Sequence, residues 1–242
     1  MGVPKPISSF LQVNWVGIAA LIIGVLTTAP AIQRSAAAYL SLPASVAIFQ
    51  LERGKQLTSQ QLATIEEELA SALGYGVNQA ELNSQLSYIS LRRLLMGQPG
   101  TAAKEQLQLA LNSVEAALKL RPLDAYLWTR YTHLSYMRDG LSPYTLAALD
   151  RSFLYGSKEK QLFQFRMVLC LTEWERLPPA LKEATVKQIE FGASHPTIWG
   201  YVLADLSVEA RAVLLGFLTS TNADIERALG IERSVRRARE TN

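Results

Sequence analysis

Few side chains in this 242-residue sequence have the chemistry of a metal ligand or a nucleophile. The two histidines, His133 and His195, have no ligand neighbour at a spacing that metal sites use. His133 lies beside an apolar helical stripe, which favours a packed side chain over a ligand. Cys170 follows an apolar run, and no histidine is placed to activate it, so we interpret it as a core residue rather than a nucleophile.

The acidic run Glu66-Glu67-Glu68 is the remaining cluster of titratable residues. It is typical of a solvated helix face rather than of paired catalytic carboxylates. The sequence contains no phosphate-binding loop, dinucleotide-binding turn or nucleophile elbow. We therefore predict no catalytic residue, no cofactor and no metal site, with an enzyme of unrecognised all-helical site as the alternative.

Aromatic residues concentrate between residues 126 and 165, where they either fill a core or line a surface that grips a partner. We expect Trp128, Tyr131 and Phe163 to lie inside. The residues that flank them, and that we predict as a partner-binding surface, are Tyr126, Arg130 and Tyr136.

A cluster of arginines near the C-terminus is a second candidate surface. It would contact anionic lipid or an acidic partner, and the alternative is a solvated, frayed helix end. The cluster comprises Arg233, Arg236, Arg237 and Arg239.

No charged residue occurs between Lys5 and Arg34, and Trp15–Ile32 is almost wholly apolar. About 20 residues of helix span a bilayer, so we predict a transmembrane anchor, with Trp15 at the membrane interface. A cleaved signal peptide and a buried core helix are the alternatives. We expect a single-pass protein of the bacterial inner membrane with its soluble domain in the periplasm, since so short an N-terminal tail is easily retained in the cytoplasm.

The rest of the chain is divided by strong helix start and stop signals, and no segment alternates with the period of a strand. Thr58 with Gln61 forms a capping-box pattern, Pro43 interrupts the segment after the anchor, and the whole chain is predicted to be all-α. The expected helices include 59–73, a helix from Asn78 to Met96, 102–120, 125–138, 143–155, 159–176 and 182–192.

A pattern of about 35 residues recurs, because Ala117–Leu134 overlays Ser152–Leu169, and a stretched third copy includes Trp199. This period predicts a degenerate tetratricopeptide-like stack of antiparallel helix pairs. Thr132 and Met167 occupy positions where a smaller residue is expected, so a generic helical bundle is the alternative.

Composition sets broad limits. Apolar residues make up 49% of the chain and charged residues 19%, and the formal net charge is +3. These values exclude bulk disorder, and the scattered positive charge predicts no nucleic-acid partner. A single cysteine excludes an intrachain disulfide.

The apolar anchor, the stretch ALKLRPLDAYLW (117–128) and the stretch RSFLYGSKEKQLFQFRMVLCLTEWERLPPALKE (151–183) give the sequence a likeness to one family. The chain resembles, over residues 10–200, small membrane-anchored helical-repeat proteins of bacterial exopolysaccharide and O-antigen biosynthesis, of the VpsP type. The resemblance implies an accessory role in polysaccharide assembly or export and carries over no active-site residue.

These features predict four regions: a tail and anchor (1–34), a juxtamembrane connection (35–57), a helical-repeat domain (58–221) and a basic C-terminal helix or tail (222–242). We expect a non-catalytic adaptor that binds other membrane-bound envelope or polysaccharide-assembly proteins. A scaffold for secretion or division is the alternative, and the sequence leaves the oligomeric state open.

Overall fold

The computed structural model describes residues 15–97, 100–192, 196–220 and 225–240, and within these ranges every regular element is helical. The prediction of an all-α chain is confirmed. The elements are α1 (Trp15–Glu52), α2 (Ser59–Leu73), α3 (Gln79–Leu95), α4 (Thr101–Leu120), α5 (Ala125–Asp139), α6 (Pro143–Gly156), α7 (Lys160–Thr172), the 3₁₀ turn η1 (Trp174–Arg176), α8 (Pro179–Gly192), α9 (Pro196–Asp205), α10 (Val208–Ser220) and α11 (Ile225–Glu240).

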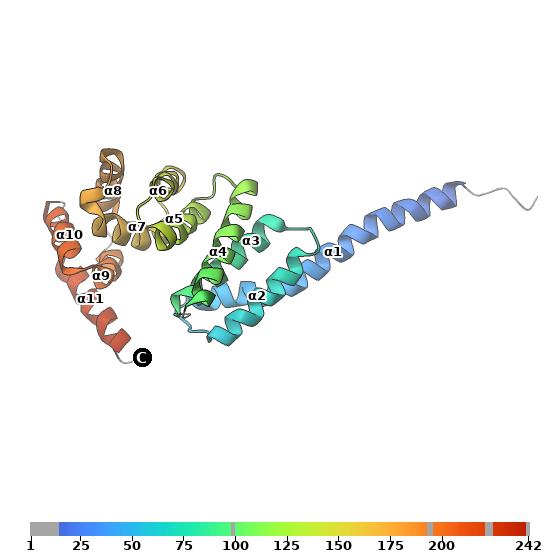
Figure 1. Cartoon of the computed structure of the whole chain (residues 1–242), viewed down its shortest axis with the longest axis horizontal. Helices are drawn as coiled ribbons and strands as arrows, with labels where there is room; N and C mark the ends of the chain where they lie inside the picture. The colour runs from blue at the N-terminus through green and yellow to red at the C-terminus, as the bar shows by residue number, and fades with distance from the viewer. Residues whose placement is uncertain (1–14, 98–99, 193–195, 221–224, 241–242) are drawn as a thin grey trace, which may run out of the picture.

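Helix α1 runs for 38 residues and contains both Pro30 and Pro43. The prediction that Pro43 interrupts the helix is wrong. A proline removes one helical hydrogen bond, and packing of the flanking residues offsets that loss. Ala37, Ala44 and Ala47 are each at most 3% exposed and belong to one core cluster with residues of α2 and α3. The first half of α1 projects from one end of the molecule (Figure 1).

Helices α1 to α6 pack mainly on their neighbours in the sequence, as Figure 1 shows. Local signals set several of their starts. The Thr58 side chain accepts a hydrogen bond from the Gln61 backbone at 3.2 Å, and the Gln61 side chain accepts one from the Thr58 backbone at 2.8 Å, so the predicted capping box is present. Asp124 likewise accepts hydrogen bonds from two backbone N–H groups at the start of α5.

The C-terminal helices pack in a different order, because α9 contacts α11 and α7 more extensively than it contacts α10. The aromatic rings of Phe163 and Trp199 meet edge to face with centroids 4.8 Å apart, and both side chains are buried. A Cβ atom at Gly192 would lie 2.6 Å from the Phe163 ring, so this close approach requires glycine. The predicted helix 159–176 ends earlier, at Thr172, and η1 follows it.

Equivalent positions of the predicted repeat differ in environment. Phe163 is 1% exposed, whereas Trp128, which overlays it, is only partly buried and lies under the guanidinium of Arg151. The expectation that Phe163 lies inside is confirmed. Trp128 and Tyr131, which were also expected inside, are only partly buried. The tetratricopeptide-like stack stays a prediction.

Candidate interaction surfaces

Tyr126 lies at the start of α5 and contacts the turn that leads into α7. Its hydroxyl donates a hydrogen bond to Glu159 Oε2 at 3.0 Å and also contacts Gln161 Oε1. Burial, followed by the hydrogen bond to Glu159, raises the pKa of Tyr126 to about 12. The phenol therefore stays protonated at neutral pH, while its side chain remains 40% exposed.

Arg130 joins α5 to α3. Its Nη1 donates hydrogen bonds to Ser84 O at 2.5 Å and Ser87 Oγ at 2.8 Å, and its guanidinium carbon lies 5.1 Å from the centroid of the Tyr88 ring. Burial lowers the pKa of Arg130 to about 10, which still leaves the side chain charged at neutral pH. The guanidinium of Arg130 is therefore hydrogen bonded to α3 inside the fold.

Tyr136, near the end of α5, donates a hydrogen bond to Glu173 Oε1 at 2.6 Å. The other oxygen of Glu173 pairs with Arg176 Nη1 at 2.8 Å. Next in the chain is Trp174, whose ring lies 5.4 Å from Lys182 Nζ. The hydrogen bond to Glu173 raises the pKa of Tyr136 above its ordinary value.

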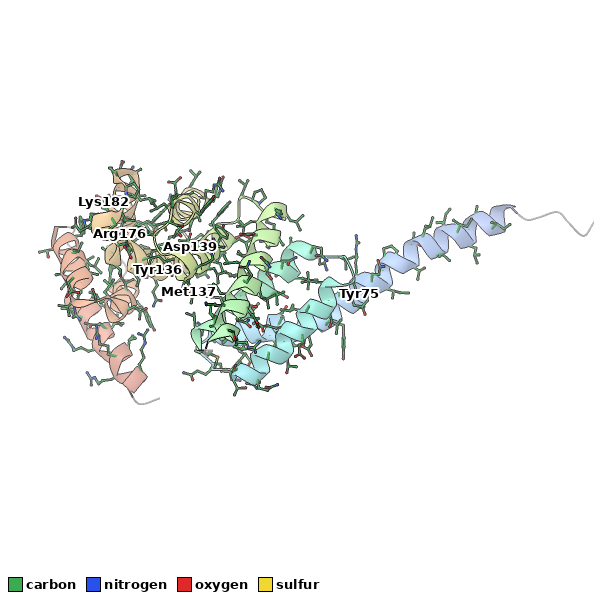
Figure 2. All side chains as sticks on the ribbon, viewed as in Figure 1. Tyr75, Tyr136, Met137, Asp139, Arg176 and Lys182 are labelled. Carbon is green, nitrogen blue, oxygen red and sulfur yellow. The ribbon has the colours of Figure 1, made fainter. Side chains whose placement is uncertain are left out.

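These five residues (Tyr136, Glu173, Trp174, Arg176 and Lys182) form a mixed aromatic and charged cluster that we name the η1 patch. Arg176 is exposed and the other four are partly buried. Figure 2 labels Tyr136, Arg176 and Lys182. The three residues predicted on α5 are therefore not brought together. Tyr126, Arg130 and Tyr136 contact three different neighbours, and Tyr136 belongs to the η1 patch.

The basic residues of α11 are partly engaged inside the protein. Glu232 is 3% exposed and accepts hydrogen bonds from both Arg211 and Arg236, and Arg239 pairs with Asp205 of α9 at 2.5 Å. Arg237 also has an interaction within the chain, and Arg233 is exposed. Because Ala228 is buried as well, this part of α11 is packed against α9 rather than frayed. A lipid or acidic-partner contact stays a prediction.

The two described residues with the most reactive side chains, His133 and Cys170, are partly buried and fully buried. The His133 ring stacks on Phe165 with centroids 4.3 Å apart, and burial lowers the pKa of His133 to about 4. Cys170 is fully buried, and burial raises the pKa of its thiol to about 12. His195 lies outside the described residues, and among those described no group of three or more potential ligands could hold a metal ion.

The prediction that Glu66 lies on a solvated face is wrong. Glu66 is 5% exposed and accepts hydrogen bonds from Ser90 Oγ at 2.6 Å, Arg93 Nη1 at 2.5 Å and Gln106 Nε2. This buried cluster joins α2, α3 and α4. The signal was available in the sequence, because Glu66 falls on the apolar stripe that contains Leu62, one turn earlier.

Arg166 was also missed, although it lies on the buried face of α7. It is 0% exposed, and it donates hydrogen bonds to Gly156 O at 2.7 Å, Ser152 Oγ at 2.8 Å and Ser152 O. These carbonyls end α6, where the helix dipole favours a cation. Ser152 Oγ in turn lies 2.5 Å from Thr129 Oγ1, so one polar chain joins α5, α6 and α7.

The projecting half of α1 exposes many large apolar side chains, whereas the second half of the same helix is packed on the body. Within the described residues, α1 is the one helix that is long and apolar enough to cross a membrane. Its most apolar window contains no buried residue, unlike a core helix. The exposed side chains, between 40% and 69% accessible, are Ile18, Leu21, Ile22, Ile23, Val25, Leu26 and Ile32.

A cavity of about 540 Å³ lies between α6 and α8. Its walls are largely apolar, with Phe153 and Phe191 among them, and Lys158 and Lys187 also line it. Lys187 already pairs with Glu183 at 2.6 Å. No arrangement of groups in this cavity identifies a ligand.

Over the residues that the structure describes, the fold is all-helical, and the first half of α1 exposes a long apolar segment. Comparisons with protein-family models, with curated proteins and with solved structures give no match to this chain.

Proposed function

We propose that the chain is a membrane-anchored, non-catalytic helical adaptor that holds envelope proteins together at the bacterial inner membrane. The observation that carries the proposal is α1 itself. One helix contains an exposed apolar half and a half packed in the helical body. A membrane is the medium in which such an exposed half is favourable.

The continuity of α1 supports an adaptor in particular. Ala44 and Ala47 pack among residues of α2 and α3, so the body is fixed to the anchor without a flexible linker. An anchored body is confined near the membrane surface, which raises its effective concentration toward other membrane proteins. The η1 patch offers such partners the exposed charge of Arg176, with partly buried aromatic residues and Lys182 beside it.

A binding role also agrees with the state of the titratable groups. Cys170 is buried, His133 is partly buried, and the charged groups of Glu66 and Arg166 are already hydrogen bonded inside the protein. Of these four residues only His133 reaches the surface, and only in part. The assignment to polysaccharide assembly or export rests on the sequence resemblance, and the periplasmic position of the body is a prediction from the sequence.

Membrane extraction tests the anchor. We expect the full chain to remain with membranes washed at alkaline pH, and the double variant Leu21→Asp, Val25→Asp to become soluble. Leu154→Asp is the matched control, since Leu154 is 69% exposed on α6, outside the anchor. A wild-type chain that is extracted at alkaline pH overturns the anchor, and a mature chain that lacks the segment indicates a cleaved signal peptide.

Complementation tests the role. We expect deletion of the gene to reduce surface polysaccharide, the wild-type chain to restore it, and the η1 patch variant Arg176→Ala, Lys182→Ala to restore it only in part. Glu67→Ala, an exposed residue on α2, is the control outside the patch. Normal polysaccharide together with a defect in secretion or division would replace this role by that of a scaffold for another envelope machine.

A further inference from the structure

The packed half of α1 has a second, unpacked face with large apolar side chains. Its inner face consists of small residues such as Ala37 and Ala44, which contact the body. On the outer face the large apolar residues follow one another at spacings of three, four and three. They are Tyr39, Leu42, Val46 and Phe49, which are 74%, 56%, 54% and 52% exposed.

The same spacing extends back through the projecting half of α1. Steps of alternately three and four residues lead through Ile18, Leu21, Val25, Thr28, Ile32 and Ser35 to Tyr39. All ten positions are exposed, and only Thr28 and Ser35 are polar. In the projecting half nearly every residue is apolar, so the spacing there does not distinguish one face from another. After Arg34 the large exposed apolar residues fall only at positions of this row, so this part of α1 carries the evidence for the spacing.

A repeat of 3.5 residues is the pattern of a helix that supercoils with another helix. Contact with lipid requires no such period. We propose that two copies of this chain pair in parallel and in register along this row, from Ile18 to Phe49. The pairing rests on the proposed anchor, because two copies inserted in one membrane in the same direction present parallel α1 helices.

Self-complementarity favours a second copy over a different helix. In register, Thr28 faces Thr28 and Ser35 faces Ser35, so no polar position of the row is set against an apolar one. A shift by one heptad would set Ser35 against Leu42. After Arg34, the positions that flank the row carry no charge until Glu52, so two copies do not repel each other there. These positions are Ala36, Ala38, Pro43, Ser45 and Gln50.

The row offers a contact surface of the size of one side of a standard interface, half of it within the proposed anchor. The eight large apolar side chains of the row are 40–74% exposed. At on the order of 100 Å² each, they offer about 800 Å² per copy, which is the area that one partner of a standard interface buries. A groove of about 550 Å³ between α1 and α2, with Leu42 and Val46 on one wall and Ile65 on the other, leaves room beside the row for side chains of the second copy.

Cysteine cross-linking in membranes tests the pairing. The single native cysteine, Cys170, is buried, so it does not interfere. We expect Leu42→Cys and Val46→Cys to form disulfide-linked dimers under mild oxidation, at least tenfold more than Gln33→Cys, which is exposed on α1 but neither on the row nor at a flanking position. Equal cross-linking on and off the row overturns the proposal. A row-specific product with the mass of a different protein also overturns it, because the partner is then not a second copy.

A charge substitution provides an independent measurement. We expect Val46→Glu to weaken association of the detergent-solubilised full chain at least tenfold, measured by energy transfer between labelled copies, and Gln33→Glu, which lies away from the row and its flanking positions, to leave it unchanged. Equal association of the Val46→Glu and wild-type chains contradicts the pairing. Alkaline extraction of the same membranes separates the two proposals: a retained chain without cross-links disproves pairing alone, whereas an extracted chain disproves the anchor.

Discussion

The projecting half of α1 and the interior of the helical body distribute their side chains in opposite ways. In α1, Leu21 and Leu26 are 69% and 67% exposed, whereas in the body the charged residues Arg166 and Glu66 are 0% and 5% exposed. A water-soluble domain usually shows the reverse. The interior charges have hydrogen-bond partners, so they join helices, while the apolar face of α1 has none of the packing that would cover it.

The contrast shows that buried charged residues and exposed apolar residues have different roles in this protein. A buried charge contributes to architecture when carbonyls, hydroxyls or an opposite charge surround it. An exposed apolar helix requires an apolar medium or a partner. Substitutions in the two regions therefore have effects of very different size on the stability of the body.

The largest effect is expected for Arg166→Ala. The substitution removes the guanidinium that donates hydrogen bonds to three acceptors near the end of α6, and it leaves a cavity in the core. We expect the free energy of unfolding to fall by about 4 kcal/mol, measured by urea denaturation of the full chain in detergent micelles. The control Arg176→Ala, with a 65% exposed side chain, should cost about 0.5 kcal/mol. Equal losses would show that Arg166 is no more important than a surface residue.

Acidification is expected to have the next largest effect. The folded protein keeps His133 neutral down to its pKa of about 4, whereas the unfolded chain binds a proton below about 6.5. Stability is therefore full above pH 6.5 and falls as the pH drops from 6.5 to 4, by up to about 3 kcal/mol. His133→Phe should remove this part of the pH dependence in urea denaturation series. An unchanged slope in that variant would contradict the burial of His133.

Glu66→Gln is expected to cost about 2 kcal/mol, because hydrogen bonds from Arg93, Ser90 and Gln106 to a charged carboxylate become bonds to a neutral amide. The neighbouring Glu67 is exposed, so Glu67→Gln serves as the matched control and should lie within about 0.5 kcal/mol of the wild type. Thermal unfolding monitored by circular dichroism compares the two. Equal behaviour would place Glu66 on the surface, as the sequence had predicted.

The smallest effect on stability is expected at Leu21. Leu21→Asn should change the unfolding free energy of the body by less than about 0.5 kcal/mol, because the side chain contacts no core. Leu62→Asn, at a position that is 0% exposed, should cost about 3 kcal/mol. Urea denaturation in micelles measures both. A large loss at Leu21 would show that the projecting half packs on the body.

Part of the candidate site was predictable from the sequence. The exposed apolar segment follows from composition, because Lys5 and Arg34 bracket a run without charge. The locations of Cys170 and His133 follow from the apolar residues around them. The partners of Tyr126, Arg130 and Tyr136 were not predictable, because each contacts an element at least 33 residues away in the sequence.

The sequence by itself determined the helical class and most helix ends, because capping side chains, glycines and prolines act within a few residues of their own positions. Only the tertiary structure decided the rest. It carried α1 through Pro43 and buried Glu66 and Arg166. It also set α9 against α11 and left one face of α1 uncovered. These outcomes depend on which distant helix supplies the packing surface or the hydrogen-bond partner, and no local pattern contains that information.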